Sequence, residues 1–364
     1  MSPTLLSRLR DLTALPGPSG HEREVALVFA KHLRAYTDDV VLDPFGNVIA
    51  TVRGEDARGT VMVSAHLDEV SLIVKHVDPD GMLRVDLNGW IDPRVVLAAQ
   101  VEVWTRNGPV AGVVGARSAH LMTPEDQRRP VDVTDLWVQV GAESAAEARA
   151  LGIRIGDLVT YRPSFQELAG GYVASKALDD RAGLTVLLEA LDRLPPRRDY
   201  DLYVVGAAQE EVGSRGARVA AQTLRPHIAL SVDTVAGAEP GTPLSRATEA
   251  SGGGPVIRAW EWVATSLMGT AYHRGVFRRL QDVAEAAGIL HQLDVARTWT
   301  DACGTSVVGH GVPTGGLYMA RRNAPAPCEV AKLSDIEGAA RLLTAVLGGL
   351  TGREVQALGS VTRL

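Results

Sequence analysis

One change of pattern limits the folds that are open to this chain of 364 residues. From about residue 2 to 69, and again after residue 177, helical and strand patterns alternate. Between residues 71 and 163 the chain instead carries short strands of alternating apolar and polar residues, with turns at Asp78–Gly81 and Asn107–Gly108. Strands flanked by helices are typical of a sheet covered on both faces. We therefore predict an α/β fold with a mixed sheet, interrupted by a small β-barrel.

A buried strand in the first α/β segment runs directly into ionisable residues. The ten residues from Val61 read VMVSAHLDEV, so His66, Asp68 and Glu69 follow an apolar run without an intervening turn. Ionisable groups cost free energy when they lose water, unless something compensates them. Because open α/β sheets place function at the carboxyl ends of their strands, this position is a candidate site.

Acidic residues also follow the other strands expected in the sheet. Glu210 and Glu211 follow DLYVVGAAQ, Asp233 follows HIALSV, and Asp179 with Asp180 opens the helix after the insertion. Each alone has a simpler explanation, since an aspartate can cap a helix or begin a turn. Together they would repel one another around a single histidine unless a cation lay among them. The sequence therefore predicts a metal site.

The spacing within two of these motifs suggests roles. Residues two apart on a strand face the same side, so we expect Asp68 to lie behind His66 and orient its ring while His66 binds metal. The side chains of Glu210 and Glu211 diverge, which leaves one to bind metal and the other to act as a general base. One imidazole with several carboxylates suits zinc, cobalt or manganese.

Composition argues against several other classes. The formal net charge of -6 gives no indication of a nucleic-acid partner. There are two cysteines, Cys303 and Cys328, in no paired pattern, which favours a cytoplasmic location over secretion. The first residues form an amphipathic helical pattern rather than a signal peptide, and no apolar run has the length of a membrane span.

The motifs together resemble those of the dinuclear TET-type metallo-aminopeptidases, also known as glutamyl or FrvX-like aminopeptidases and, by an older label, endoglucanases. SAHLDEV, KALDDRAG, AAQEEVGSRGA, SVD and TDA occur in the order found in that family. The resemblance implies a zinc-peptidase-like catalytic domain over residues 1–69 and 166–364, with a β-barrel dimerisation domain inserted at residues 70–165. It also implies homo-oligomers, either dimers alone or dimers assembled into a tetrahedral dodecamer.

The same resemblance implies a set of metal ligands. His66 and Asp233 match ligands of the first metal, Glu211 matches a ligand of the second, and Asp179 matches the aspartate that bridges both, with Asp180 as its neighbour. The cofactor would be one or two divalent ions per subunit, zinc or cobalt first and manganese as the alternative. The implied reaction is the removal of N-terminal residues from short peptides.

The resemblance further implies two catalytic residues. Glu210 matches the general base, which takes a proton from the attacking water and passes it to the leaving amine, and Asp68 matches the carboxylate that orients His66. Two readings from other classes compete. Glycoside hydrolysis by Glu210 and Asp68 leaves His66 and Asp233 unexplained. A nucleophilic Cys303 has no histidine partner nearby in the sequence.

One position departs from the family pattern. The last ligand of the family is a histidine in an R-Y-I-H-S-P-x-E-like segment, and in LYMARRNAPAPCEV that position falls on Pro325, which has no metal-binding group. Asn323, Cys328 and His310 are the candidates to replace it. The chain is then either an active enzyme with a weakened second site or a catalytically impaired relative that acts in peptide binding or assembly.

Overall fold

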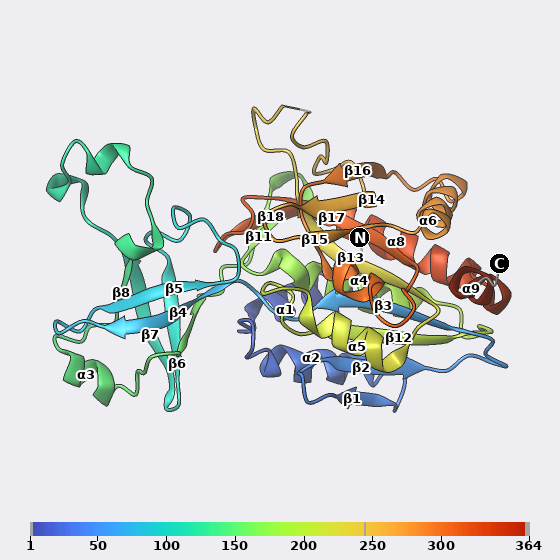
Figure 1. The fold of residues 1–364 in the computed structure, drawn as a ribbon, viewed down its shortest axis with the longest axis horizontal. Coiled ribbons are helices and arrows are strands. Elements are labelled where there is room, and N and C mark those ends of the chain that lie inside the picture. Colours follow the sequence, from blue (N-terminus) through green and yellow to red (C-terminus); the bar gives the residue numbers. More distant parts are fainter. Residues whose placement is uncertain (1–2, 244, 361–364) are drawn as a thin grey trace.

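The computed structural model describes residues 3–243 and 245–360. Within these ranges the chain forms a helix-covered α/β body and a smaller barrel that projects from it (Figure 1). No helix of the described ranges is both long and apolar enough to cross a bilayer. The α-helices are α1 (Pro3–Ala14), α2 (Arg23–Leu33), α3 (Ala145–Ala150), α4 (Leu178–Arg193), α5 (Arg215–Leu224), α6 (Arg274–Ala286), α7 (Asp301–Ser306), α8 (Leu333–Gly349) and α9 (Gly352–Gly359).

A mixed sheet forms the centre of the α/β body. Its strands are β1 (Val40–Leu42), β2 (Val48–Val52), β3 (Thr60–His66), β10 (Gln166–Leu168), β11 (Tyr172–Ser175), β12 (Asp201–Ala207), β13 (Ile228–Ala236), β14 (Val256–Val263), β15 (Met268–Ala271), β16 (Gln292–Ala296), β17 (Thr314–Arg322) and β18 (Glu329–Lys332). They lie in the order β1-β2-β12-β3-β13-β17-β18-β11-β10, and β14 joins β15 and β16 to β17. Strands β12, β3, β13 and β17 run parallel, whereas the outer neighbours β2 and β18 pair antiparallel. The predicted mixed α/β sheet is therefore confirmed.

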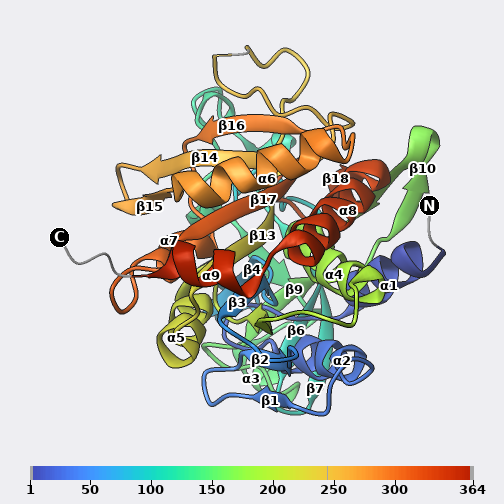
Figure 2. The same cartoon turned by 90° about the vertical axis from the view of Figure 1, so that its right-hand side faces the viewer.

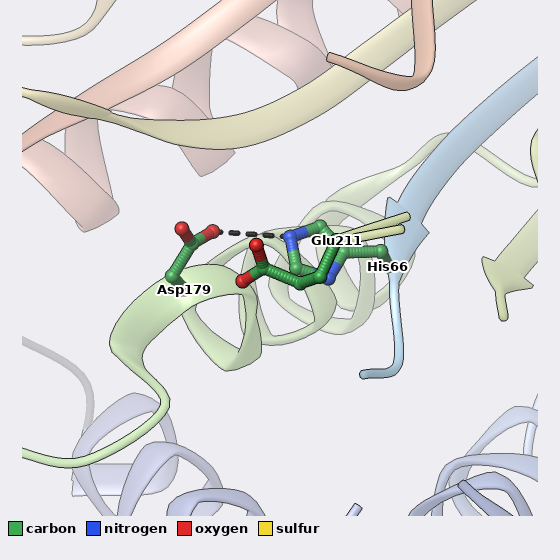
Figure 3. A group of neighbouring side chains, drawn as sticks. All are labelled: His66, Asp179 and Glu211. Carbon is green, nitrogen blue, oxygen red and sulfur yellow. Dashed lines mark hydrogen bonds and ion pairs between the residues drawn. The ribbon is translucent and has the colours of Figure 1, made fainter. Parts of the chain in front are cut away.

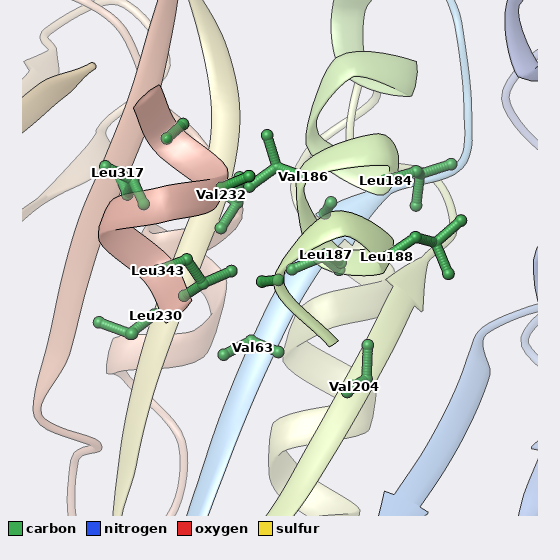
Figure 4. Close-up of a cluster of buried hydrophobic side chains, with 14 of the residues drawn as sticks. Val63, Leu184, Val186, Leu187, Leu188, Val204, Leu230, Val232, Leu317 and Leu343 are labelled. Atoms are coloured by element: carbon green, nitrogen blue, oxygen red, sulfur yellow. The ribbon is translucent and has the colours of Figure 1, made fainter. Parts of the chain in front are cut away.

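Both faces of the sheet are buried, and β3 shows why its sequence is apolar throughout. Val61 and Val63 pack into a cluster with residues of α1, α2, α4, α6 and α8, whereas Met62 packs on the opposite face with residues of α5. Figure 4 shows Val63 and Val204 beneath the leucines of α4. Helices α4 and α8 lie side by side on one face (Figure 2). Helices on each face leave no polar side for the central strands.

The inserted segment forms a closed barrel in the order β4-β5-β8-β7-β6-β9. These strands are β4 (Ser71–Val77), β5 (Leu83–Asn88), β6 (Gln100–Thr105), β7 (Gly108–Gly115), β8 (Trp137–Gln139) and β9 (Leu158–Tyr161). The two predicted hairpins are confirmed as the antiparallel pairs β4–β5 and β6–β7. Leu72, Val103 and Val138 belong to an apolar cluster inside the barrel that is separate from the core of the α/β body. Closure of the barrel leaves no unpaired sheet edge.

Candidate metal centre

The carboxyl ends of β3 and β12, together with the second half of β13, place the predicted site. His66 is the last residue of β3 and pairs in register with Ala207, the last residue of β12. Glu210 and Glu211 follow β12 directly, and Asp233 lies on β13, on the other side of β3. The helix α4 brings Asp179 to the same point, where it faces His66 and Glu211 (Figure 3).

The predicted ligands come together around the His66 ring. Its Nε2 lies 3.0 Å from Asp179 Oδ1 and 3.7 Å from Asp233 Oδ1. Two groups have ligand atoms that all lie within 4.8 Å of one another, and both groups include His66. One contains Asp179 and Glu211, and the other contains Asp180 and Asp233. The structure thus adds Asp180 to the four residues predicted as ligands, across a cis peptide bond from Asp179.

The Asp68 carboxylate is fully buried and makes contacts that the sequence analysis did not predict. Its Oδ1 lies 3.4 Å from His66 Nδ1, as expected for an orienting group. The same oxygen accepts a hydrogen bond from the backbone N–H of Glu210, and Oδ2 accepts from Glu211 N–H and from the hydroxyl of Ser19. Burial raises the pKa of Asp68, but its hydrogen bonds with His66 and Ser19 outweigh this and hold the pKa below its ordinary value.

The third ionisable residue of the opening motif has a different partner. Glu69 lies in neither ligand group, and its Oε1 is 2.8 Å from the Nζ of Lys176, which is equally buried. The same oxygen also accepts a hydrogen bond from the backbone N–H of Gly17. An ion pair therefore compensates Glu69, so this residue does not depend on a metal.

Among the described residues, Asp180, Glu210 and Asp233 form no ion pair with a lysine or an arginine. Burial raises the pKa of Asp180, Glu210 and Asp233 well above the ordinary values, and neighbouring acidic groups add to the effect. Burial lowers the pKa of His66, but its hydrogen bonds with Asp179 and Asp68 raise it by more. Among the described residues, the buried Oε1 of Glu211 has no hydrogen-bond partner. This donor set and its excess of buried negative charge fit a divalent cation beside His66.

A cationic side chain lies on the other side of Asp179. Arg321, near the end of β17, donates a hydrogen bond to Asp179 Oδ2, and its Nη1 is 3.0 Å from Glu329 Oε1. Glu329 Oε2 also accepts a hydrogen bond from the backbone N–H of Asp179. Neither residue is a candidate from the sequence alone, because a basic residue at a strand end is not by itself a signal for a site and Glu329 begins β18 rather than following a strand.

The three candidates for a replacement second ligand differ from the predicted ligands in being exposed. They are His310, Asn323 and Cys328. The backbone N–H of Asn323 donates to the side chain of Glu239. Neither His310 nor Cys328 belongs to a metal-binding group in the part of the chain that the structure describes.

Cys303 does not have the surroundings of a nucleophile. It is buried, and its thiol lies 3.4 Å from the hydroxyl of Ser214. Burial raises the pKa of the Cys303 thiol to about 11, whereas reactive cysteines have lowered pKa values. Its neighbour Asp301 is also buried, and both of its carboxylate oxygens lack a hydrogen-bond partner among the described residues.

Comparisons with known proteins find relatives that match nearly the whole chain. A family model of the M42 glutamyl aminopeptidases matches residues 46–342. The lysyl aminopeptidase of Pyrococcus furiosus is 32% identical over 343 residues, which cover 93% of this chain and 95% of that protein. An aminopeptidase from the archaeon Desulfurococcus kamchatkensis superimposes with a TM-score of 0.92 at 32% identity, over 98% of each chain.

A further solved structure matches with its whole length. The TET1 peptidase of Pyrococcus horikoshii, which can assemble into a tetrahedron or a large octahedral shell, superimposes with a TM-score of 0.83 at 30% identity. The match covers 95% of this chain and 100% of that one. The resemblance inferred from the motifs is confirmed, and this chain belongs to the M42 glutamyl aminopeptidase family.

Proposed function

We propose that this protein is a metal-dependent aminopeptidase that hydrolyses N-terminal residues from short peptides. The observation that carries the proposal is the convergence of His66 with the carboxylates of Asp179, Glu211 and Asp233 within the distances of a metal site. Membership of the M42 family supports the same reaction class. A zinc or cobalt ion, with manganese as the alternative, would be held by these residues.

The chain supplies the groups that handle protons. A cation at His66 would provide Lewis acidity, which polarises a peptide carbonyl and makes water more acidic. Glu210 accepts the proton of the attacking water and delivers it to the leaving amine. Burial raises the pKa of the Glu210 carboxyl, which makes it a stronger base than an exposed glutamate. Asp68 positions both His66 and Glu210, since it contacts the His66 ring and the backbone of Glu210.

A second candidate is a catalytically impaired relative that binds peptides or serves in assembly. The presence of Arg321 in the cluster favours it, as does Pro325 at the position that the family pattern assigns to a histidine. Glycoside hydrolysis has less support. Asp68 would have to act as its nucleophile or acid, yet three hydrogen bonds already engage both of its oxygens.

The test compares the native protein with Glu210→Gln. Each is stripped of metal, reloaded with zinc, cobalt or manganese, and assayed on a panel of aminoacyl p-nitroanilides and short peptides. We expect native activity to require the ion, and the Glu210→Gln variant to lose about 10²- to 10⁴-fold in kcat with unchanged metal content. Glu285→Gln on the exposed face of α6 is the matched control.

Two results would contradict the assignments. Full activity of Glu210→Gln would show that Glu210 is not the general base. If the native protein bound metal but hydrolysed no substrate with any of the three ions, the impaired relative would be the correct reading. Binding of intact peptides, measured by calorimetry on the same samples, would then identify its role.

We further propose that the protein forms homo-oligomers, in which the barrel of residues 70–165 joins two subunits. The solved TET1 peptidase supports this, since it can assemble into a tetrahedron or a large octahedral shell. Assembly of such dimers into a tetrahedral dodecamer is the larger form that we expect. Light scattering on the native protein distinguishes the dimer from the dodecamer.

A further inference from the structure

The two oxygens of the Asp179 carboxylate have different partners. Oδ1 lies 3.0 Å from His66 Nε2, on the side of the site that fits a metal. Oδ2 accepts a hydrogen bond from the guanidinium of Arg321. A carboxylate that bridged two metals would place one oxygen on each, so Arg321 lies where this carboxylate would hold a second cation.

The Arg321 side chain is fixed in this position. Only 5% of the residue is exposed, and its Nε donates to the hydroxyl of Thr234 at 2.5 Å. Its Nη1 lies 3.0 Å from Glu329, which in turn accepts the backbone N–H of Asp179. A buried guanidinium held by two carboxylates does not leave the cluster at low cost, because the carboxylates would then be unpaired.

The surroundings of Arg321 also lack the histidine of the family pattern. The position that the family pattern assigns to a histidine is Pro325, and the exposed His310 and Cys328 lie outside the ligand groups of the described residues. A divalent ion beside the guanidinium would in addition be repelled, because like charges a few ångströms apart interact strongly in a buried site.

We infer that the Arg321 guanidinium takes the place of the second metal ion, so that this protein binds one divalent cation per chain, at His66. The inference rests on the proposed metal-dependent function. Arg321 would give the site a second positive charge that does not depend on metal supply, since arginine stays protonated at all working pH values.

The metal count of the native full-length protein is the first test. Protein saturated with zinc, cobalt or manganese in turn and freed of excess ion is analysed by inductively coupled plasma mass spectrometry. One ion per chain supports the inference, and two tightly held ions per chain overturn it. No bound ion would instead contradict the proposed metal-dependent function, so the two failures are distinguishable.

Variants then test whether Arg321 determines the number of metal ions bound per chain. We expect Pro325→His alone to bind one ion, because the guanidinium remains, and the double variant Arg321→Met with Pro325→His to bind two. The matched control is Arg322→Met with Pro325→His, which removes the neighbouring arginine of β17 and should stay at one ion. A double variant that folds and still binds one ion would contradict the role of Arg321.

A spectroscopic measurement covers the case in which Arg321→Met does not fold. Native protein loaded with manganese should give the electron paramagnetic resonance spectrum of isolated Mn²⁺ ions. A spectrum of exchange-coupled manganese pairs in the native protein would overturn the inference without any substitution.

Discussion

The carboxylate of Asp68 accepts a hydrogen bond of 2.9 Å from the backbone N–H of Glu210. A second bond, of 3.1 Å, runs from the N–H of Glu211 to Oδ2 of Asp68. The Oδ1 that accepts from Glu210 also lies 3.4 Å from Nδ1 of His66. One buried group on the loop after β3 therefore positions both the imidazole and the turn that carries the tandem glutamates.

Replacement of Asp68 by asparagine should reduce both metal affinity and turnover. The amide would place an NH₂ group against one of the backbone N–H donors of Glu210 and Glu211, and it would remove the charge near His66. Groups that orient metal ligands typically contribute about 10- to 100-fold. We expect a loss of this size in kcat/KM and in zinc affinity, measured by competition with a chelating dye. Asp86→Asn, on the exposed face of the barrel, is the control. If Asp68→Asn kept the native kcat/KM and the native zinc affinity, Asp68 would not have this role.

The positions of the central residues could be predicted because they follow from local pattern and one rule of topology. His66, Glu210 and Asp233 each lie at or after an apolar strand, and parallel strands bring their carboxyl ends together. The barrel hairpins are local as well, since their turns lie at Asp78–Gly81 and Asn107–Gly108. In both cases the signal lies within about ten residues of the feature that it predicts.

Other parts of the site depend on contacts between distant segments. Ser19 binds Asp68 across 49 positions of the sequence, and Arg321 binds Asp179 across 142. Nothing near either residue indicates its partner. The strand β14 has a weak sequence signal for a different reason, because a bulge between Arg258 and Trp260 shifts its register and breaks the two-residue period.

The stability of the protein should carry a pH dependence that comes from Glu22. Burial, followed by the neighbouring Asp68, raises the pKa of Glu22 from 4.5 to about 7. The folded state then binds more protons than the unfolded state between these values, so this residue reduces the free energy of unfolding as pH rises from about 4.5 to about 7. Its Oε1 accepts from Gly20 and Gln209, and glutamine keeps both hydrogen bonds.

We therefore expect the stability of Glu22→Gln, relative to the native protein, to increase with pH by roughly 1 to 3 kcal/mol over this window. Urea unfolding at pH 5, 6, 7 and 8 measures the difference. Glu24→Gln, an exposed residue of α2, controls for the loss of a nearby charge. If the difference in the free energy of unfolding between Glu22→Gln and the native protein stays constant with pH, the pKa of Glu22 is the same in the folded and unfolded states.

Removal of divalent ions should lower the thermal stability. Without a cation, the buried carboxylates of Asp180, Glu210 and Asp233 repel one another around His66. An ion present at about 100 times its Kd stabilises the folded state by about 2.7 kcal/mol. We expect a chelator to lower the melting temperature and one equivalent of zinc to restore it in the native protein and in His76→Gln, but not in His66→Gln. Equal melting temperatures with and without metal would contradict the prediction.

The edge of the sheet at β16 should contribute to assembly. Leu293 and Val295 lie two residues apart on this strand and are 47% and 66% exposed, and an apolar edge strand is a typical contact surface between subunits. We expect Leu293→Glu combined with Val295→Glu to lower the oligomer mass in analytical ultracentrifugation, because burying two carboxylates at a subunit contact is unfavourable. Leu27→Glu, at an exposed leucine of α2 outside the barrel, tests whether any added charge has this effect. An unchanged mass for the double variant would place the contacts elsewhere on the molecule.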